Sequence, residues 1–290
     1  MSKKRVRKIK LDSDRKIAFN KFTMSENLEI LIKEKTDYGV IRFTMNDLVS
    51  KNALSKKLIG LLIDELKSVS LDKSIKVVVL AANGNVFSAG HDLKEITAAR
   101  KGKDNGEAFF KDLFNLCSEL MQLIIKMPQP VIAEINGIAT AAGCQLVASC
   151  DLALASSESQ FATPGVNIGL FCSTPMVALS RNVNKKAAMH MLLTGDLINS
   201  EKAKDIGLIN EAFQKPQLTD EVNKLAKKIA SKSSMTIKIG KKAFYNQAEM
   251  SLSKAYEYTS MTMIENLLNH DAKEGIDAFL GKRNPDWKND

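Results

Sequence analysis

The stretch "VIAEINGIATAAGCQLVASCDLALAS", residues 131–156, decides the fold. It begins with an apolar run over 131–137, continues through small residues at 140–149 and ends in a second apolar run at 151–156. Continuous apolar runs are typical of strands buried on both faces of a parallel sheet. The small-residue segment follows Gly137, which favours a turn, so we expect a helix there. The stretch therefore predicts a strand–helix–strand unit of an α/β fold.

The residues upstream of this stretch extend the same pattern. Two apolar, β-branched runs at 27–35 and 38–44 predict a β-hairpin. Helical spacing of leucines predicts a helix over 54–70, with Ser55 as its N-cap, and a further buried strand follows at 75–82. A turn-rich segment comes next. An amphipathic helix is then expected over 107–126, ended by the two prolines of "MPQP".

Downstream of 156 the pattern is mostly helical. Helices are expected over 174–193, 200–206, 217–231, 234–248, 251–269 and 271–280. Strands and helices that alternate, followed by helices alone, indicate an α/β core with a helical C-terminal part. The linker-like stretch 214–219 suggests the division: a basic tail over 1–25, a core over 26–213 and a helical region over 214–290.

Composition limits the class of protein. At 44% hydrophobic and 26% charged residues, the chain resembles ordinary soluble globular proteins, and no apolar run reaches the ~18 residues of a membrane span. The four cysteines form neither a CxxC pair nor a Cys/His cluster, so buried thiols are expected and no metal site. The start is basic and lacks the apolar segment of a secretory signal.

The net charge of +9 is concentrated at one end. Residues 1–22 hold nine Lys and Arg against two Asp, whereas the remaining residues hold 33 Lys and Arg against 31 Asp and Glu. Three interpretations of the tail stay open: a solvated disordered arm, a mitochondrial presequence, and an arm for nucleic acid or a membrane surface. Asp12 and Asp14 weigh against the presequence. The nearly neutral body disfavours nucleic-acid binding by the rest of the chain.

Two segments share a local design of apolar strand, small-residue turn and helix start. They are "VVVLAANGNVFSAGHDLKE" at 77–95 and "VIAEINGIATAAGCQL" at 131–146. Each can present a backbone N–H at a helix start, and two such groups aimed at one point would form an oxyanion hole for a thioester carbonyl. The alternative is that the small residues serve helix–strand packing only. The first turn does not have the glycine spacing of a nucleotide-phosphate loop.

Together the segments resemble the crotonase (enoyl-CoA hydratase/isomerase) superfamily over residues 27–285, and look most like its enoyl-CoA hydratase domain-containing members in mitochondria and their bacterial relatives. The matching segments are "NALS" (52–55), "VFSAGHDLKE" (86–95), "PVIAEINGIATAAGCQLVASCDLALAS" (130–156), "QFATPGVNIGL" (160–170), "LLTGDLINSEKAKDIGLINE" (192–211) and "EGIDAFLGKRNP" (274–285).

The resemblance implies a spiral core of ββα units and a C-terminal helical region that forms trimers or hexamers. It also implies an acyl-CoA substrate, no separate cofactor, and oxyanion donors at the backbone N–H of His91 and of Ala142. Substrate would further contact Ser88, Ala89, Gly90, Asp92, Leu93, Lys94 and Gly143, with Lys282 or a base of an adjacent subunit at the CoA phosphates. The compartment would be the cytoplasm in a bacterium and the mitochondrial matrix in a eukaryote.

The two positions at which the resemblance expects catalytic carboxylates hold other residues. They are Gln145, after "AAGC", and Gly165, after "FATP". A glutamine cannot exchange a proton near neutral pH, and a glycine has no side chain to do so. Glu134 is the candidate substitute, either exposed at a strand end or buried with a raised pKa. Asp92 is expected to cap a helix or to act as a base, and the His91 side chain to be packed or solvent-facing, or to be catalytic.

The leading hypothesis is an enoyl-CoA hydratase or isomerase-like enzyme of acyl-CoA and fatty acid metabolism. Decarboxylation of a malonyl-type CoA and thioester hydrolysis are alternatives that need only the oxyanion hole. A non-catalytic acyl-CoA-binding or regulatory protein is a third hypothesis, and RNA binding a fourth.

Overall fold

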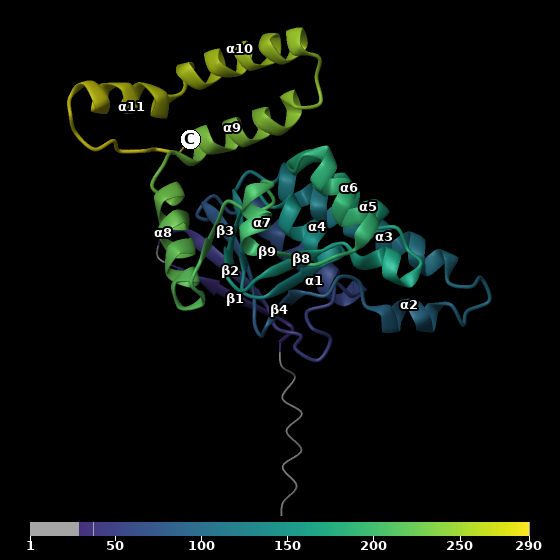
Figure 1. Ribbon diagram of the computed structural model, residues 1–290. Helices are drawn as coiled ribbons and strands as arrows, with labels where there is room; N and C mark the ends of the chain where they lie inside the picture. The colour runs from purple at the N-terminus through teal and green to yellow at the C-terminus, as the bar shows by residue number, and fades with distance from the viewer. Residues whose placement is uncertain (1–28, 37, 290) are drawn as a thin grey trace, which may run out of the picture.

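The computed structural model describes residues 29–36 and 38–289. The predicted basic tail of residues 1–25 lies outside them. Within these residues the chain is a mixed α/β protein whose central six-stranded sheet has the order β1-β2-β3-β5-β7-β10 (Figure 1). Its strands are β1 (Leu31–Lys35), β2 (Val40–Met45), β3 (Val77–Ala82), β5 (Val131–Ile135), β7 (Leu152–Ser156) and β10 (Glu211–Phe213). The β1–β2 hairpin is antiparallel, with Leu31 opposite Met45, and the other pairs are parallel.

A second sheet of four short strands runs beside the first, in the order β4-β6-β8-β9. Its strands are β4 (Val86–Ser88), β6 (Ile138–Thr140), β8 (Gln160–Ala162) and β9 (Ile198–Asn199). Each of β3, β5 and β7 is followed by a short strand of this second sheet and then by a helix. This succession, β3–β4–α2, β5–β6–α4 and β7–β8–α5, is the predicted spiral of ββα units.

The helices of the body lie between and around these strands. They are α1 (Lys56–Leu71), α2 (Leu93–Ala99), α3 (Glu107–Lys126), α4 (Ala142–Ser149), α5 (Ser173–Asn182), α6 (Lys185–Thr194), α7 (Ser200–Asp205) and α8 (Leu218–Ala230), with 3-10 turns η1 (Pro164–Ile168) and η2 (Lys215–Gln217). The larger hydrophobic cluster packs α1, α3 and α4 on one face of the central sheet. The opposite face is covered by α8 through Leu218, Val222 and Ala226. Each ββα turn thus has both faces of its long strand buried, as the continuous apolar runs predicted.

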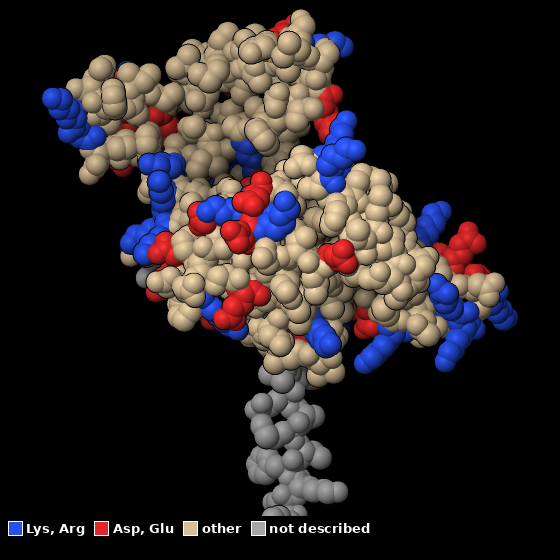
Figure 2. Space-filling model, in the orientation of Figure 1, with Lys and Arg blue, Asp and Glu red and all other residues tan. Residues whose placement is uncertain are grey.

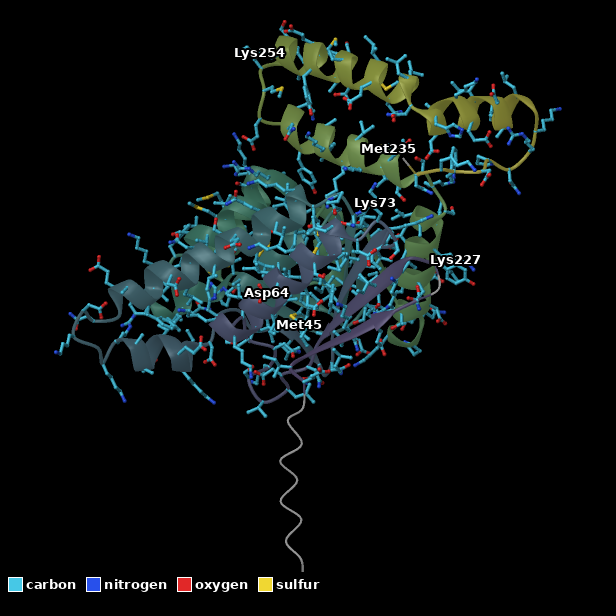
Figure 3. All side chains as sticks on the ribbon, turned by 180° about the vertical axis from the view of Figure 1, so that it is seen from behind. Met45, Asp64, Lys73, Lys227, Met235 and Lys254 are labelled. Atoms are coloured by element: carbon cyan, nitrogen blue, oxygen red, sulfur yellow. The ribbon has the colours of Figure 1, made fainter. Side chains whose placement is uncertain are left out.

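The C-terminal helices form a separate layer. They are α9 (Ser234–Gln247), α10 (Leu252–Leu268) and α11 (His270–Leu280). Figures 1 and 3 show, from opposite sides, that α10 and α11 stand away from the α/β body while α9 lies next to it; Met235 and Lys254 mark the first turns of α9 and α10. Among the described helices, none is long and apolar enough to cross a membrane.

The helix predicted over 174–193 is wrong in its extent, because the chain breaks at Val183–Asn184 into α5 and α6. The Asn184 side chain accepts a hydrogen bond from the Ala187 amide at 2.9 Å and caps α6. An N-cap asparagine stabilises a new helix start and supplies the extended backbone between the two helices. The apolar spacing continues across the break and conceals it in the sequence.

Candidate functional site

The two small-residue turns are in direct contact. A Cβ placed on Gly90 would lie 2.8 Å from the Cβ of Ala141 and 3.2 Å from the amide nitrogen of Ala142. A Cβ on Gly143 would lie 2.4 Å from the carbonyl oxygen of Ser88. Because real Cβ atoms do not approach backbone so closely, glycine at these two positions is what allows the turns to meet. The turns that follow β4 and β6 therefore form one site, at the N-terminal ends of α2 and α4.

The backbone at this contact is strained in a way that orients amides. Ala141 has φ 50° and ψ −120°, the first central position of a type II′ turn, which glycine usually occupies. A non-glycine residue in such a conformation persists only where its surroundings impose it, and such residues cluster at functional sites. Here the conformation sets the direction of the next amide, that of Ala142, at the first residue of α4.

The neighbouring amides of the first turn already have acceptors. The Ala89 amide donates to the Lys51 carbonyl, the Gly90 amide to Ser88 Oγ at 3.3 Å, and the Lys94 amide to the Asp92 side chain at 2.7 Å. In residues 29–36 and 38–289, no acceptor is recorded for the amides of His91 and Ala142. The amides predicted to be the oxyanion donors are thus among those left available for a ligand.

Asp92 is a helix cap. Its carboxylate accepts the Lys94 amide at the N-terminus of α2, as one of the two sequence interpretations expected. Leu93 and Lys94 are exposed at the edge of the site, whereas Ser88 is fully buried beneath it. Asp92 therefore stabilises the start of α2.

Neither expected carboxylate position offers a proton-transfer group. Gln145 is buried on α4, and its Oε1 accepts a weak hydrogen bond from the Cys117 thiol at 3.8 Å. Gly165 is buried at the start of η1, where a Cβ would lie 2.4 Å from the Leu170 carbonyl oxygen and 2.8 Å from Cys172 Sγ. The backbone of 170–172 thus occupies the space that a larger residue at 165 would need.

The cysteines are free and buried, as predicted. Burial raises the pKa of Cys117 and that of Cys144 to about 12, and it also raises the pKa of Cys172. These thiols are therefore protonated at neutral pH and lack the thiolate that makes a cysteine nucleophilic. Among the described residues, no group of His, Cys, Asp and Glu could hold a metal ion.

The His91 side chain packs inside the body. Its Nδ1 lies 3.2 Å from the Leu54 carbonyl oxygen, and its ring meets the Phe114 ring edge-on, with centroids 5.4 Å apart. Burial lowers the pKa of His91 below its ordinary value, although the hydrogen bond to Leu54 opposes this. The imidazole is therefore neutral at neutral pH.

Comparison with known proteins identifies the family to which this chain belongs. A family model described as Enoyl-CoA hydratase/isomerase matches residues 35–290. The chain belongs to this family. It is 46% identical over 251 residues to the mitochondrial enoyl-CoA hydratase domain-containing protein 3 of Xenopus laevis, a match that covers 87% of this chain and 84% of that protein.

Solved structures agree with this assignment. The enoyl-CoA hydratase of Mycobacterium smegmatis superposes with a TM-score of 0.86 at 43% identity, covering 89% of this chain and 99% of that one. Human enoyl-CoA hydratase domain-containing protein 3 gives 0.85 at 42% identity, covering 89% and 100%. The crotonase fold predicted from the sequence is confirmed, and the chain is of the enoyl-CoA hydratase domain-containing protein 3 type within the enoyl-CoA hydratase/isomerase family.

Glu134 is not the substitute base considered from the sequence. It alternates with the inward-facing Ala133 and Ile135, so its side chain lies on the face of the sheet that α8 covers, away from α4. There its carboxylate bonds Arg42 at 2.6 Å and the Thr219 hydroxyl at 2.7 Å. A buried carboxylate with these partners is part of the packing of α8 on the sheet.

Lys282 lies outside the site of its own chain. It is an exposed residue with φ 51° that follows α11, and Figure 1 shows α11 and α2 at opposite ends of the molecule. Contact of Lys282 with a CoA bound at the turns would require a second copy of the chain. Two hollows of about 570 Å³ and 330 Å³ also lie elsewhere, the larger among α9, α10 and α11 and the smaller between Tyr38 and Lys227.

Sequence reasoning missed the contribution of α3 to the site. Phe114 contacts His91 and Cys117 contacts Gln145, so one helix, separate in sequence from both turns, forms a wall of the site. The sequence predicted that Cys117 is a buried thiol. It contained no signal for which turn the helix would face.

Proposed function

We propose that this chain binds acyl-CoA thioesters and polarises the thioester carbonyl with the backbone N–H groups of His91 and Ala142. The observation that carries the proposal is the contact between the two turns, at which these two amides have no acceptor among residues 29–36 and 38–289. Donors fixed in place before the reaction stabilise a developing oxyanion by roughly 2.7–4 kcal/mol each. The membership in the enoyl-CoA hydratase/isomerase family supports the same ligand class.

The surface next to the turns supports a phosphate-bearing ligand. Lys94 is exposed on α2, and Arg100, Lys101 and Lys103 are exposed where α2 leads into α3. Figure 2 shows basic side chains gathered at this end of the molecule. A cationic rim beside a carbonyl-binding site is suited to the phosphates of CoA.

The reaction we propose is enoyl-CoA hydratase or isomerase-like chemistry on an enolate held by the two amides. One observation favours a second reaction: no carboxylate stands at position 145 or 165. Decarboxylation of a malonyl-type CoA forms the enolate by loss of CO₂ and needs no base. Relatives named as mitochondrial suggest that compartment for a eukaryotic source, and the helical C-terminal region suggests a trimer or hexamer.

Calorimetry with acetoacetyl-CoA, whose enolate resembles the intermediate, tests the binding. We expect saturable binding with 1:1 stoichiometry per chain, and competition by free CoA. No heat and no displacement at millimolar ligand would overturn the proposal. A panel of enoyl-, malonyl- and 3-hydroxyacyl-CoAs, followed by mass spectrometry, then separates hydration from decarboxylation.

A further inference from the structure

The tautomer of His91 is fixed by its surroundings. A carbonyl oxygen accepts only, so the 3.2 Å contact with Leu54 requires that Nδ1 carry the ring hydrogen. Because the imidazole is neutral, Nε2 then carries a lone pair and no hydrogen. The edge-on contact with Phe114 packs against the ring in this orientation.

This lone pair has no partner. Nε2 is buried and makes no hydrogen bond with any of the described residues. Buried polar atoms are nearly always hydrogen-bonded, so one that is not calls for a reason, such as a catalytic role or a ligand that supplies the missing donor. The residue is also the one whose amide we assign to the thioester oxygen, so its ring lies within a few bonds of the bound carbonyl.

The side chains of His91 and Gln145 converge on one helix. His91 packs against Phe114 and Gln145 against Cys117, and these two residues of α3 are three positions apart. Residues at this spacing are neighbours on one helix face, with Cβ atoms roughly 5–6 Å apart. The His91 ring and the Gln145 amide therefore lie against the same face of α3, and Gln145 is the position at which the resemblance places the first carboxylate.

The charged groups on the surrounding elements are engaged elsewhere. Asp92 caps α2, Glu95 accepts the Lys56 amide at 3.1 Å, and Asp112 of α3 is paired with the Lys56 side chain. The Cys117 thiol is protonated. Burial is thus the main influence on the His91 ring, and it keeps the lone pair available at neutral pH.

Resting on the proposed function, we propose that His91 Nε2 is the proton-transfer base of this site. It removes a proton from the α carbon of a thioester bound at the two amides, which leaves the electron pair on the enolate oxygen and an imidazolium at His91. Return of that proton, or of a solvent proton exchanged onto the ring, restores the thioester. In hydration, Nε2 takes a proton from water as the hydroxide oxygen bonds to the β carbon, and delivers a proton to the α carbon. Access requires the half-exposed ring of Phe114 to turn outward as the acyl group enters.

Exchange of the α hydrogens of butyryl-CoA in D₂O, followed by mass spectrometry, measures this step directly. We expect the wild-type protein to incorporate deuterium and His91→Gln to lose roughly 10²–10⁴-fold in rate, the usual size of a general base. Glutamine keeps the backbone amide and can bond Leu54, but it cannot hold a proton. His190→Gln, on an exposed histidine of α6, is the matched control and should exchange at the wild-type rate.

Two further measurements separate the possible failures. Acetoacetyl-CoA should bind His91→Gln as tightly as it binds the wild type. If the wild type does not bind acetoacetyl-CoA, the proposed function is wrong. If the wild type binds it but butyryl-CoA takes up no deuterium, only the role of His91 is wrong. The wild-type exchange rate should be constant at neutral pH and fall on acidification with an apparent pKa below 6.5, as His91 is protonated. An inflection of the wild-type exchange rate above pH 8 would assign the step to a thiol and overturn the inference. This measurement uses the wild type alone, so it decides the question even if His91→Gln does not fold.

Discussion

At the scale of single residues, position 165 shows why a family pattern does not transfer unchanged. The resemblance places catalytic carboxylates at 145 and at 165, and on that basis glutamate at both positions would be expected to restore hydration. The structure removes that expectation for 165, because the Leu170 carbonyl and Cys172 Sγ occupy the space of its Cβ. Gly165 does not have the left-handed backbone of Gly90 or Gly169, so space rather than backbone conformation is the obstacle.

Gly165→Ala should therefore destabilise the fold. Adding an atom to a closely packed position typically costs about 1–3 kcal/mol. Gly60→Ala is the matched control, since Gly60 lies within α1 with nothing within 4 Å of its Cβ position. It should stabilise by about 0.5–1 kcal/mol, because alanine favours a helix. Urea unfolding of the two variants measures both signs, and equal stability of Gly165→Ala and wild type would contradict the packing argument.

Gln145→Glu should raise the rate of α-proton exchange. The carboxylate would lie against the same face of α3 as the His91 ring, buried and thus with a raised pKa suited to proton transfer. A second proton-transfer group in place would increase deuterium uptake by butyryl-CoA at least ~10-fold. Gln122→Glu, on the exposed side of α3, is the control. A folded Gln145→Glu with an unchanged rate would mean that the reacting carbon lies out of reach of position 145.

At the scale of elements, the long strands and helices could be predicted because their burial repeats along the chain. Strands β3, β5 and β7 are each buried on both faces. β3 appears as an uninterrupted apolar run, β5 as an apolar run interrupted by Glu134, and β7 as one that ends in Ser156. The second sheet could not be predicted in this way. Its strands have two or three residues, too few to show a period, and β4 and β6 lie within the turn segments that carry the site.

The attachment of α9 was equally hidden. Lys241 Nζ donates to Asp151 at 2.6 Å and to the carbonyls of Ile124 and Gln129, both at 2.8 Å, and Tyr245 donates to the other Asp151 oxygen. In the sequence, Lys241 is one of two adjacent lysines on an amphipathic helix, and nothing distinguishes them. The burial that lowers the pKa of Lys241, against the opposing effect of Asp151, comes from a sheet end some 90 residues earlier.

Lys241→Met should loosen this attachment. Removing one member of a buried ion pair leaves Asp151 uncompensated, which typically costs about 3–5 kcal/mol. Lys242→Met, at the exposed neighbouring position, should change stability by less than about 0.5 kcal/mol. Chemical denaturation gives the energies. Limited proteolysis of Lys241→Met should cut within α9–α11 first, and identical resistance of the two variants would contradict the anchoring role.

At the scale of the whole molecule, the solvent-exposed surface of the C-terminal layer, helices α9 to α11, carries many large apolar side chains. Helices α9, α10 and α11 expose large apolar side chains that a stable monomer would bury. They are Phe244, Leu268, Phe279 and Leu280, which are 64%, 83%, 83% and 73% exposed. Figure 2 shows few charged side chains on the visible face of this layer. Large apolar patches mark interaction surfaces, and a patch on three helices with little contact to their own body favours other copies of the chain.

Light scattering should therefore give a mass of three or six times the 31.9 kDa of one chain at micromolar concentration. Leu268→Lys with Phe279→Lys places two charges on the apolar surface and should shift the mass toward that of a single chain, because burying an unpaired charge is costly. Leu71→Lys is the control, since Leu71 is as exposed, at 85%, but ends α1 on the α/β body. If the wild type has the mass of one chain at every concentration from about one to one hundred micromolar, the apolar layer does not mediate self-association.

Assembly could also bring Lys282 of one copy to the turns of another. In that case the monomeric double variant should bind CoA more weakly while it still exchanges α hydrogens, which separates the role of assembly from that of His91.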